Sequence, residues 1–159
     1  MLEENPQILS EKRTVGLVCK PERPLMGKIA SQLVDTLVSL NVDVQVDKGS
    51  CDVIHQKAEP TAIEDMDVDF VITIGGDGTS LYTLTQLKDR EMPLFCVNRG
   101  TVGFMTEAST TAANGSLKRI LDNDCIIESV VNLSSGVGDT VFEDARELIN
   151  KINKTRRKR

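Results

Sequence analysis

Apolar and polar residues follow one another along the first hundred positions in two rhythms, one typical of buried strands and one typical of amphipathic helices. Short runs rich in Val, Ile and Leu predict strands at 14–19, 42–47, 70–74 and 94–97. After the first run, apolar residues recur at steps of three and four, which predicts a helix with one buried stripe. The members of this stripe are Met26, Ile29, Ala30, Leu33, Val34, Leu37 and Leu40.

A second helix is predicted from about Thr79 to Arg90, with Leu81, Leu84 and Leu87 as its apolar stripe. The run at 70–74 is continuous and β-branched, as expected for a strand that is covered on both faces. Since strands and helices alternate, the pattern predicts an α/β fold with an open, largely parallel sheet between two layers of helices.

The other segments carry weaker signals. Pro60 is suited to the first position of a short helix that runs through Glu64. Residues 109–116 resemble a loop, 117–121 predict one or two helical turns, and 125–131 resemble a strand. A capping box at 140–143 predicts the start of a final helix. We therefore expect a tail over 1–13, an α/β domain over 14–122, and a remnant strand, linker and C-terminal helix with a basic tail over 123–159.

The composition fits one ordinary globular domain, because 40% of the 159 residues are hydrophobic and 27% are charged. No apolar run approaches the roughly 20 residues that cross a bilayer, and the acidic start of the chain does not resemble a secretory signal. We therefore expect no membrane association, and the cytoplasm is the default location. The four cysteines lie far apart and form no CxxC pair, which favours thiols in a reducing compartment. His55, the single histidine, is expected at the surface rather than in a metal site.

The net charge of −5 is unevenly distributed, because the last nine residues hold six of the 19 Lys and Arg. The rest of the chain is accordingly acidic. Nucleic-acid binding requires a clustered basic face, so the sequence argues against a nucleic-acid partner. The basic tail suits either a docking signal or a solvated helix end.

Three glycines surround one carboxylate directly after the strand at 70–74: Gly75, Gly76, Asp77 and Gly78 precede Thr79. In an open parallel sheet, ligands bind beyond the carboxyl ends of the strands. Glycine lets a ligand approach the backbone, and the start of the following helix suits phosphate. An acid beside phosphate is explained by an intervening Mg²⁺ or by a hydroxyl that it orients or deprotonates. Alternatively, Asp77 only caps the helix.

The turn is neither a P-loop, which needs a lysine after the glycines, nor a GxGxxG fingerprint. A second cluster follows the next strand, and its candidate residues are Asn98, Gly100, Gly103, Phe104 and Thr106. Over 14–106 the pair GGDGT and NRGTVGFMT resembles the NAD kinases, whose pattern is GGDGT, a helix, a strand and N-x-G-x-x-G-F-[LMY]-T. Lipid kinases share GGDGT alone and continue into a proline-containing loop. The resemblance implies a Rossmann-like α/β fold of the NAD kinase and diacylglycerol kinase type.

The resemblance also implies ATP-dependent phosphorylation of the 2′-hydroxyl of the adenosine ribose of NAD, with Mg²⁺ carried on the nucleotide phosphates rather than by protein ligands. Asp77 would activate the hydroxyl. Gly75, Gly76, Gly78 and Thr79 would hold phosphates through their backbone amides. Phe104 would line the adenine pocket, or else belong to the core, and Asn98 and Gly100 would shape that loop. Arg99 pairs with phosphate in one interpretation and lies in solvent in the other.

NAD kinases of this type have a second, β-rich domain, in which an Asn-Glu or Asn-Asp pair holds the NAD ribose. We expect this chain to lack most of that domain, and Asn123-Asp124 is not assigned the ribose role because it has no apolar lead-in. Two hypotheses follow. The chain is an NAD kinase, alone or completed by a partner, or it is a catalytically incomplete module for nucleotide binding or oligomerisation. Family members form dimers or tetramers, so we expect a homo-oligomer.

Overall fold

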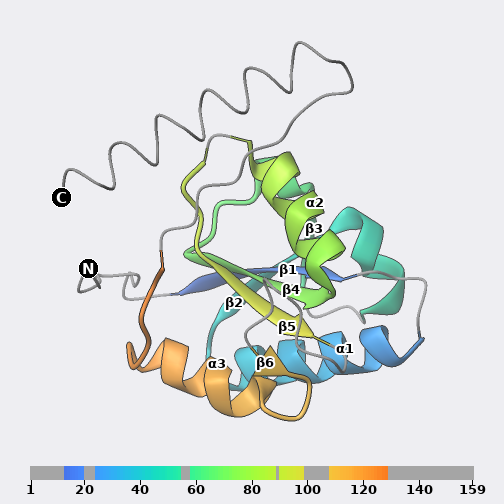
Figure 1. Cartoon of the computed structure of the whole chain (residues 1–159). Coiled ribbons are helices and arrows are strands. Elements are labelled where there is room, and N and C mark those ends of the chain that lie inside the picture. The colour runs from blue at the N-terminus through green and yellow to red at the C-terminus, as the bar shows by residue number, and fades with distance from the viewer. Residues whose placement is uncertain (1–12, 20–23, 55–57, 89, 99–107, 129–159) are drawn as a thin grey trace, which may run out of the picture. The chain divides into compact units, whose positions relative to one another are not determined.

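The computed structural model describes residues 13–19, 24–54, 58–88, 90–98 and 108–128. Six strands form one sheet in the order β3-β2-β1-β4-β5-β6 (Figure 1). Every neighbouring pair of strands is parallel. The strands are β1 (Thr14–Cys19), β2 (Asp43–Asp47), β3 (Glu59–Thr61), β4 (Phe70–Gly75), β5 (Leu94–Asn98) and β6 (Ala108–Ser109). The predicted open parallel α/β fold is confirmed.

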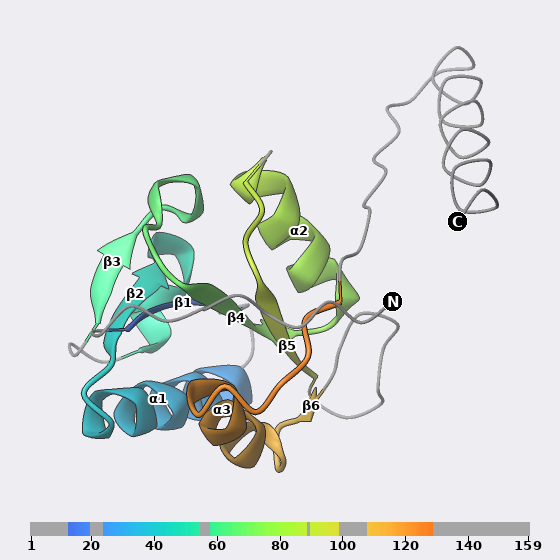
Figure 2. The same cartoon turned by 90° about the vertical axis from the view of Figure 1, so that its left-hand side faces the viewer.

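In the described part of the chain, three α-helices cover the two faces of this sheet. They are α1 (Pro24–Ser39), α2 (Asp77–Leu87) and α3 (Ala113–Leu121), and two short 3-10 helices accompany them, η1 (Lys48–Val53) and η2 (Ile63–Asp65). Figure 2 shows α1 and α3 on one face of the sheet and α2 on the other. The side chains of Thr36 in α1 and Asn114 in α3 are joined by a hydrogen bond of 3.3 Å. The helices and the sheet therefore form three layers.

The core is divided between the two faces because successive side chains of a strand point to opposite sides. Leu17 and Ile72 face α1 and α3, in a cluster that also contains Leu33 and Leu117. Val18 and Val71, their neighbours in sequence, belong to a smaller cluster on the other face together with Ile63, Met66 and Leu87. The central strands β1 and β4 are thus buried on both sides, as the continuous apolar run at 70–74 predicts.

Helix α2 differs from its predicted form. Of its expected stripe only Leu87 is buried, whereas Leu81 is 41% exposed and Leu84 is partly buried. The sheet-facing positions of its first turns are instead Thr79, Ser80 and Thr83. The side chains of Ser80 and Thr73 of β4 are 3.0 Å apart, so small hydroxyl residues allow the helix to lie close to the strand. The prediction of a leucine stripe was wrong because small hydroxyl residues face the sheet instead; those of Ser80 and Thr83 are bonded to Thr73 and to the carbonyl of Thr79.

Three of the weaker predictions also need correction. Pro60 lies in β3 and opens no helix; the short helix η2 begins three residues later, at Ile63. The segment 109–116 contains the end of β6 and the first turn of α3 rather than only a loop. Residues 125–128 form no strand, and 129–131 lie outside the described residues. The capping box at 140–143, the basic tail and His55 lie outside them as well.

Both margins of the sheet are short strands. β3 has three residues and includes Pro60, and β6 has two residues. A proline in a sheet is accommodated at an edge strand because it has no N–H to donate. Among the described residues, no helix is long and apolar enough to cross a membrane.

Candidate functional site

The GGDGT turn and the first residue of the second motif, Asn98, lie side by side at the carboxyl edge of the sheet. β4 ends at Gly75 and β5 ends at Asn98, and these two residues are partners in the parallel pairing of the strands. The backbone N–H of Thr110 donates to the carbonyl of Asn98 at 3.1 Å, which connects the end of β5 to the start of the segment that leads to α3. The sequence therefore places the GGDGT turn beside the beginning of the second cluster, at the edge where open parallel sheets bind ligands.

The turn passes directly from strand to helix. Gly76 is the N-cap of α2, with extended backbone angles of φ −116° and ψ −171°, and Asp77 is the first helical residue. The N–H of Thr79 donates to the carbonyl of Gly76 at 3.0 Å. Glycine has no side chain with which to cap the helix, so the cap position does not occupy the space in front of the first amides. Asp77 is not the N-cap residue, which removes the interpretation of Asp77 as a simple cap.

The three glycines of the turn have different surroundings. A Cβ atom added to Gly75 would lie 2.3 Å from Oγ1 and 2.9 Å from Cβ of Thr79, which is closer than real side chains approach. A Cβ atom added to Gly76 or Gly78 would meet none of the described residues within 4 Å. Gly75 is thus required by contact with Thr79, while Gly76 and Gly78 have no such close neighbour in the part of the chain that the structure describes. Asp77 lies between these two glycines and is partly exposed.

The base of the turn is a small group of buried hydroxyls. Thr73, Thr79, Ser80 and Thr83 are each at most 3% exposed. Thr83 Oγ1 donates to the carbonyl of Thr79 at 2.9 Å, and Thr73 and Ser80 bond to each other. Thr79 Oγ1 has no hydrogen-bond partner among the described residues. An unpartnered buried hydroxyl costs about 1–3 kcal/mol, so its position calls for a physical explanation.

The short helix η1, which follows β2, lies at the same edge of the sheet. Ser50, which is fully buried, lies beside the end of β1, and its hydroxyl is 3.3 Å from Oδ2 of Asp47 at the end of β2. Burial raises the pKa of the Asp47 carboxyl, and the charge of Glu64 adds to this; hydrogen bonds from Ser50 and the backbone of Gly49 and Lys48 oppose it. Nothing in the sequence identified Ser50, because a serine in a polar stretch has no periodic signal.

Several predicted site residues lie outside the part of the chain that the structure describes. They are Arg99, Gly100, Gly103, Phe104 and Thr106. Cys19 and Cys96 are buried thiols within the strands β1 and β5, and Cys125 is partly buried. Within the described ranges, no group of three or more His, Cys, Asp or Glu side chains is arranged to hold a metal ion.

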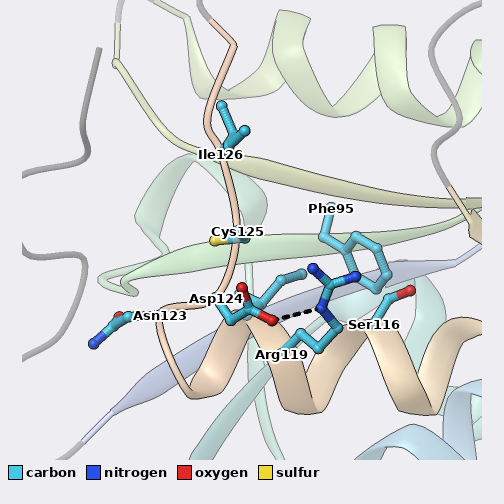
Figure 3. Close-up of a pocket in the computed structure, with 8 residues that line it drawn as sticks. Phe95, Ser116, Arg119, Asn123, Asp124, Cys125 and Ile126 are labelled. Carbon is cyan, nitrogen blue, oxygen red and sulfur yellow. Dashed lines mark hydrogen bonds and ion pairs between the residues drawn. The ribbon is translucent and has the colours of Figure 1, made fainter. Parts of the chain in front are cut away.

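Two cavities lie away from the glycine turn. One, of about 430 Å³, is lined by Phe95 near the start of β5 and by the last turn of α3 with the residues after it (Figure 3). At this cavity Arg119 and Asp124 form an ion pair of 2.8 Å, with both side chains about two-thirds exposed. The other, of about 510 Å³, includes Thr14, Asp43 and Glu59, the first residues of β1, β2 and β3. Asn123-Asp124 therefore belongs to a different region from Asp77.

The topology and the turn define a class: open, all-parallel α/β domains in which a glycine-flanked acid starts a helix at the carboxyl edge of the sheet. A family model described as the ATP-NAD kinase N-terminal domain matches residues 15–125. The chain belongs to the NAD kinase family, as the paired motifs predict.

Relatives and solved structures agree with this assignment. The NAD kinase of Methanothermobacter thermautotrophicus is 31% identical over 136 residues, which are 85% of this chain and 48% of the relative. The NAD kinase of Thermococcus gammatolerans is 32% identical over 138 residues, which are 82% of this chain and 49% of the relative. The chain thus spans about half the length of the curated relatives it matches.

Among solved structures, an NAD kinase from Archaeoglobus fulgidus in complex with ATP has a TM-score of 0.50 and 27% identity, covering 69% of this chain and 37% of that one. A yeast NADH kinase complexed with NADH has a TM-score of 0.61 over 72% of this chain and 39% of that one. At 16% identity, the yeast enzyme supports the fold alone.

Proposed function

We propose that this chain contributes the phosphoryl-transfer half of an NAD kinase, which uses ATP and Mg²⁺ to phosphorylate the 2′-hydroxyl of the adenosine ribose of NAD. The observation that carries the proposal is the position of Asp77, the first residue of α2, between two glycines at which an added Cβ atom would meet no described residue within 4 Å. Membership of the NAD kinase family and the ATP named in the Archaeoglobus complex support the choice of reaction.

In the proposed reaction, Asp77 accepts a hydrogen bond from the ribose hydroxyl and takes its proton as the oxygen attacks phosphorus. Phosphoryl transfer depends mainly on positioning and on neutralising charge. The start of α2 carries the positive end of the helix dipole, which favours phosphate there. No described residue lies within 4 Å of a Cβ atom built on Gly76 or Gly78, which leaves room for phosphate oxygens to approach the backbone at these two positions.

Magnesium fits this site as an ion carried by the nucleotide. Mg²⁺ is commonly held by one or two carboxylates together with substrate phosphates. The described residues contain no cluster that would form a metal cage by themselves, and Asp77 is assigned to the ribose hydroxyl, so the nucleotide phosphates would hold the ion. When bound, the ion would neutralise the phosphate charge.

The alternative function is a nucleotide-binding or oligomerisation module. The chain spans about half the length of the curated relatives it matches, and this half would act as such a module if it binds nucleotide without turnover.

The two functions differ in turnover. Purified protein is incubated with NAD, ATP and Mg²⁺, and NADP is measured enzymatically at increasing protein concentration. Replacing Asp77 by Asn keeps the shape and removes the base, so we expect a loss of about 10²–10⁴-fold in kcat. Asp67→Asn, at an exposed carboxylate on another loop, is the matched control. Equal turnover by wild type and Asp77→Asn would refute the assigned role, and ATP binding without NADP formation would favour the module.

A further inference from the structure

The residues of the GGDGT turn do not all have the same surroundings, and this suggests a division of roles. We propose that Gly75 and Thr79 are positioning residues that fix α2 against the end of β4, whereas the open side at Gly76 and Gly78 is where the nucleotide phosphates bind. The inference rests on the proposed function and refines it, because the family resemblance assigns phosphate binding to all four residues alike.

The contact between Gly75 and Thr79 is tight and directional. The nearest atoms to a Cβ built on Gly75 all belong to Thr79: Oγ1 at 2.3 Å, Cβ at 2.9 Å and Cγ2 at 3.4 Å. Thr79 is only 3% exposed, so its side chain is directed at the backbone of the strand end rather than at the space outside the turn. Thr79 therefore acts as a spacer that sets the distance between strand and helix.

Thr79 is also held so that it cannot easily move away. Its N–H donates to the carbonyl of Gly76 at 3.0 Å, and its own carbonyl accepts from Thr83 Oγ1 at 2.9 Å. The next residue, Ser80, is joined to Thr73 of β4 at 3.0 Å. A methyl group at position 75 would thus have to displace the first turn of α2, and Asp77 with it. Through this contact the two residues position Asp77 without touching substrate.

The other two glycines have the opposite character. Alanine at Gly76 or Gly78 meets no atom of the described residues within 4 Å, so this part of the fold accepts it. At Gly78, inside the first turn of α2, alanine also improves helix propensity. Glycine at these positions gives no advantage to the folded chain itself, whereas a ligand that approaches the backbone would collide with the added methyl group.

The positioning half of the inference is tested by a double-mutant cycle on thermal unfolding with Gly75→Ala, Thr79→Ala and the double variant. We expect Gly75→Ala to lower the Tm and the double variant to recover part of the loss, since removing Oγ1 and Cγ2 leaves only the 2.9 Å approach to Cβ. In kinetics, Gly75→Ala should lower kcat at least tenfold with KM for ATP changed less than threefold. Two outcomes would overturn the positioning role of Gly75 and Thr79. One is that the Tm losses of the single variants are additive in the double variant, and the other is that Gly75→Ala folds normally and loses ATP affinity.

The ligand half is tested by isothermal titration of Mg²⁺-ATP into Gly76→Ala and Gly78→Ala. We expect dissociation constants raised at least tenfold, an unchanged Tm for Gly76→Ala, and a Tm higher by about 2–4 °C for Gly78→Ala. Wild-type affinity in both variants would overturn this half, as would a wild-type protein that binds neither Mg²⁺-ATP nor NAD. The unfolding and binding readouts need no turnover, so a chain that binds ATP but forms no NADP contradicts the proposed function and leaves this inference standing.

Discussion

Ser50 and Cys19, which are 31 residues apart in sequence, are joined by two hydrogen bonds through one hydroxyl. The N–H of Cys19 donates to Ser50 Oγ at 3.0 Å, and Ser50 Oγ lies 2.9 Å from the Cys19 carbonyl, to which it donates. Cys19 is the last residue of β1 and is paired with Ile74 of β4, whereas the pairing of β1 with β2 ends two residues earlier, at Leu17 and Val46. The serine thereby replaces a sheet contact and attaches η1 to the carboxyl edge of the sheet.

Replacing Ser50 by Ala should destabilise the protein by about 1–3 kcal/mol, because two buried backbone groups of Cys19 lose their partner. Urea unfolding followed by circular dichroism measures the difference. Ser39→Ala is the matched control, since Ser39 also bonds a backbone carbonyl, at 2.7 Å, but is exposed at the end of α1. We expect the control to stay within about 0.5 kcal/mol of wild type. Equal effects of the two replacements would contradict the bridging role.

Asp47 predicts a dependence of stability on pH. Its pKa is raised from 3.8, first by burial and then by the charge of Glu64, so the folded state holds the proton more tightly than the unfolded state. The free energy of unfolding therefore decreases as the pH rises through the interval from 3.8 to the raised pKa, and the loss remains at higher pH.

Asp47→Asn removes this titration. The Tm of the variant minus the Tm of the wild type should therefore be higher at pH 7 than at pH 3. Calorimetry at both values of pH, with Asp67→Asn as an exposed control, measures the difference. A Tm difference that shifts in the opposite direction would show that hydrogen bonds to the carboxylate outweigh its burial.

The hydroxyl pair of Thr73 and Ser80 should show strong coupling. Thr73→Val or Ser80→Ala alone leaves the other hydroxyl buried without its partner at 3.0 Å, at a cost of about 1–3 kcal/mol. In the double variant neither hydroxyl remains, and we expect it to be less destabilised than the sum of the single variants by about 1 kcal/mol. Chemical unfolding of the three variants provides the comparison. Additive losses would mean that the pair contributes by packing alone.

The sequence predicts the sheet well because its signal comes from burial. The strands β1, β4 and β5 fall within one residue of the apolar runs that predict them, and the stripe of α1 is buried at Met26, Leu33 and Leu37. Periodicity was misleading for α2, where Thr79, Ser80 and Thr83 face the sheet. In isolation, these residues are as typical of a surface as of a helix–strand contact. Only the spatial pairing of Thr73 with Ser80 reveals that they are inside.

For the candidate site, the motif identified the glycine-rich turn but not the side-chain packing that supports it. Asp77 and its glycines were selected from their place after a buried strand and from the family resemblance, and the structure pairs Gly75 of this turn with Asn98, the first residue of the second motif. The contact between Gly75 and Thr79 was not predictable, because it depends on a side chain four residues later that turns back toward the strand. The roles of Asp77 and of the residues after Asn98 remain predictions.

The two edge strands of the sheet are short: β3 has three residues and includes a proline, and β6 has two residues. They limit the association of this sheet with a strand of another molecule. Adding a foreign strand to a sheet requires a row of unoccupied backbone donors and acceptors, and neither margin offers more than a fragment of one. Growth into fibrils by this route is therefore disfavoured. We expect an interface of this domain to be formed by side chains of helices and loops instead. Single substitutions of such side chains are able to disrupt an interface of this kind.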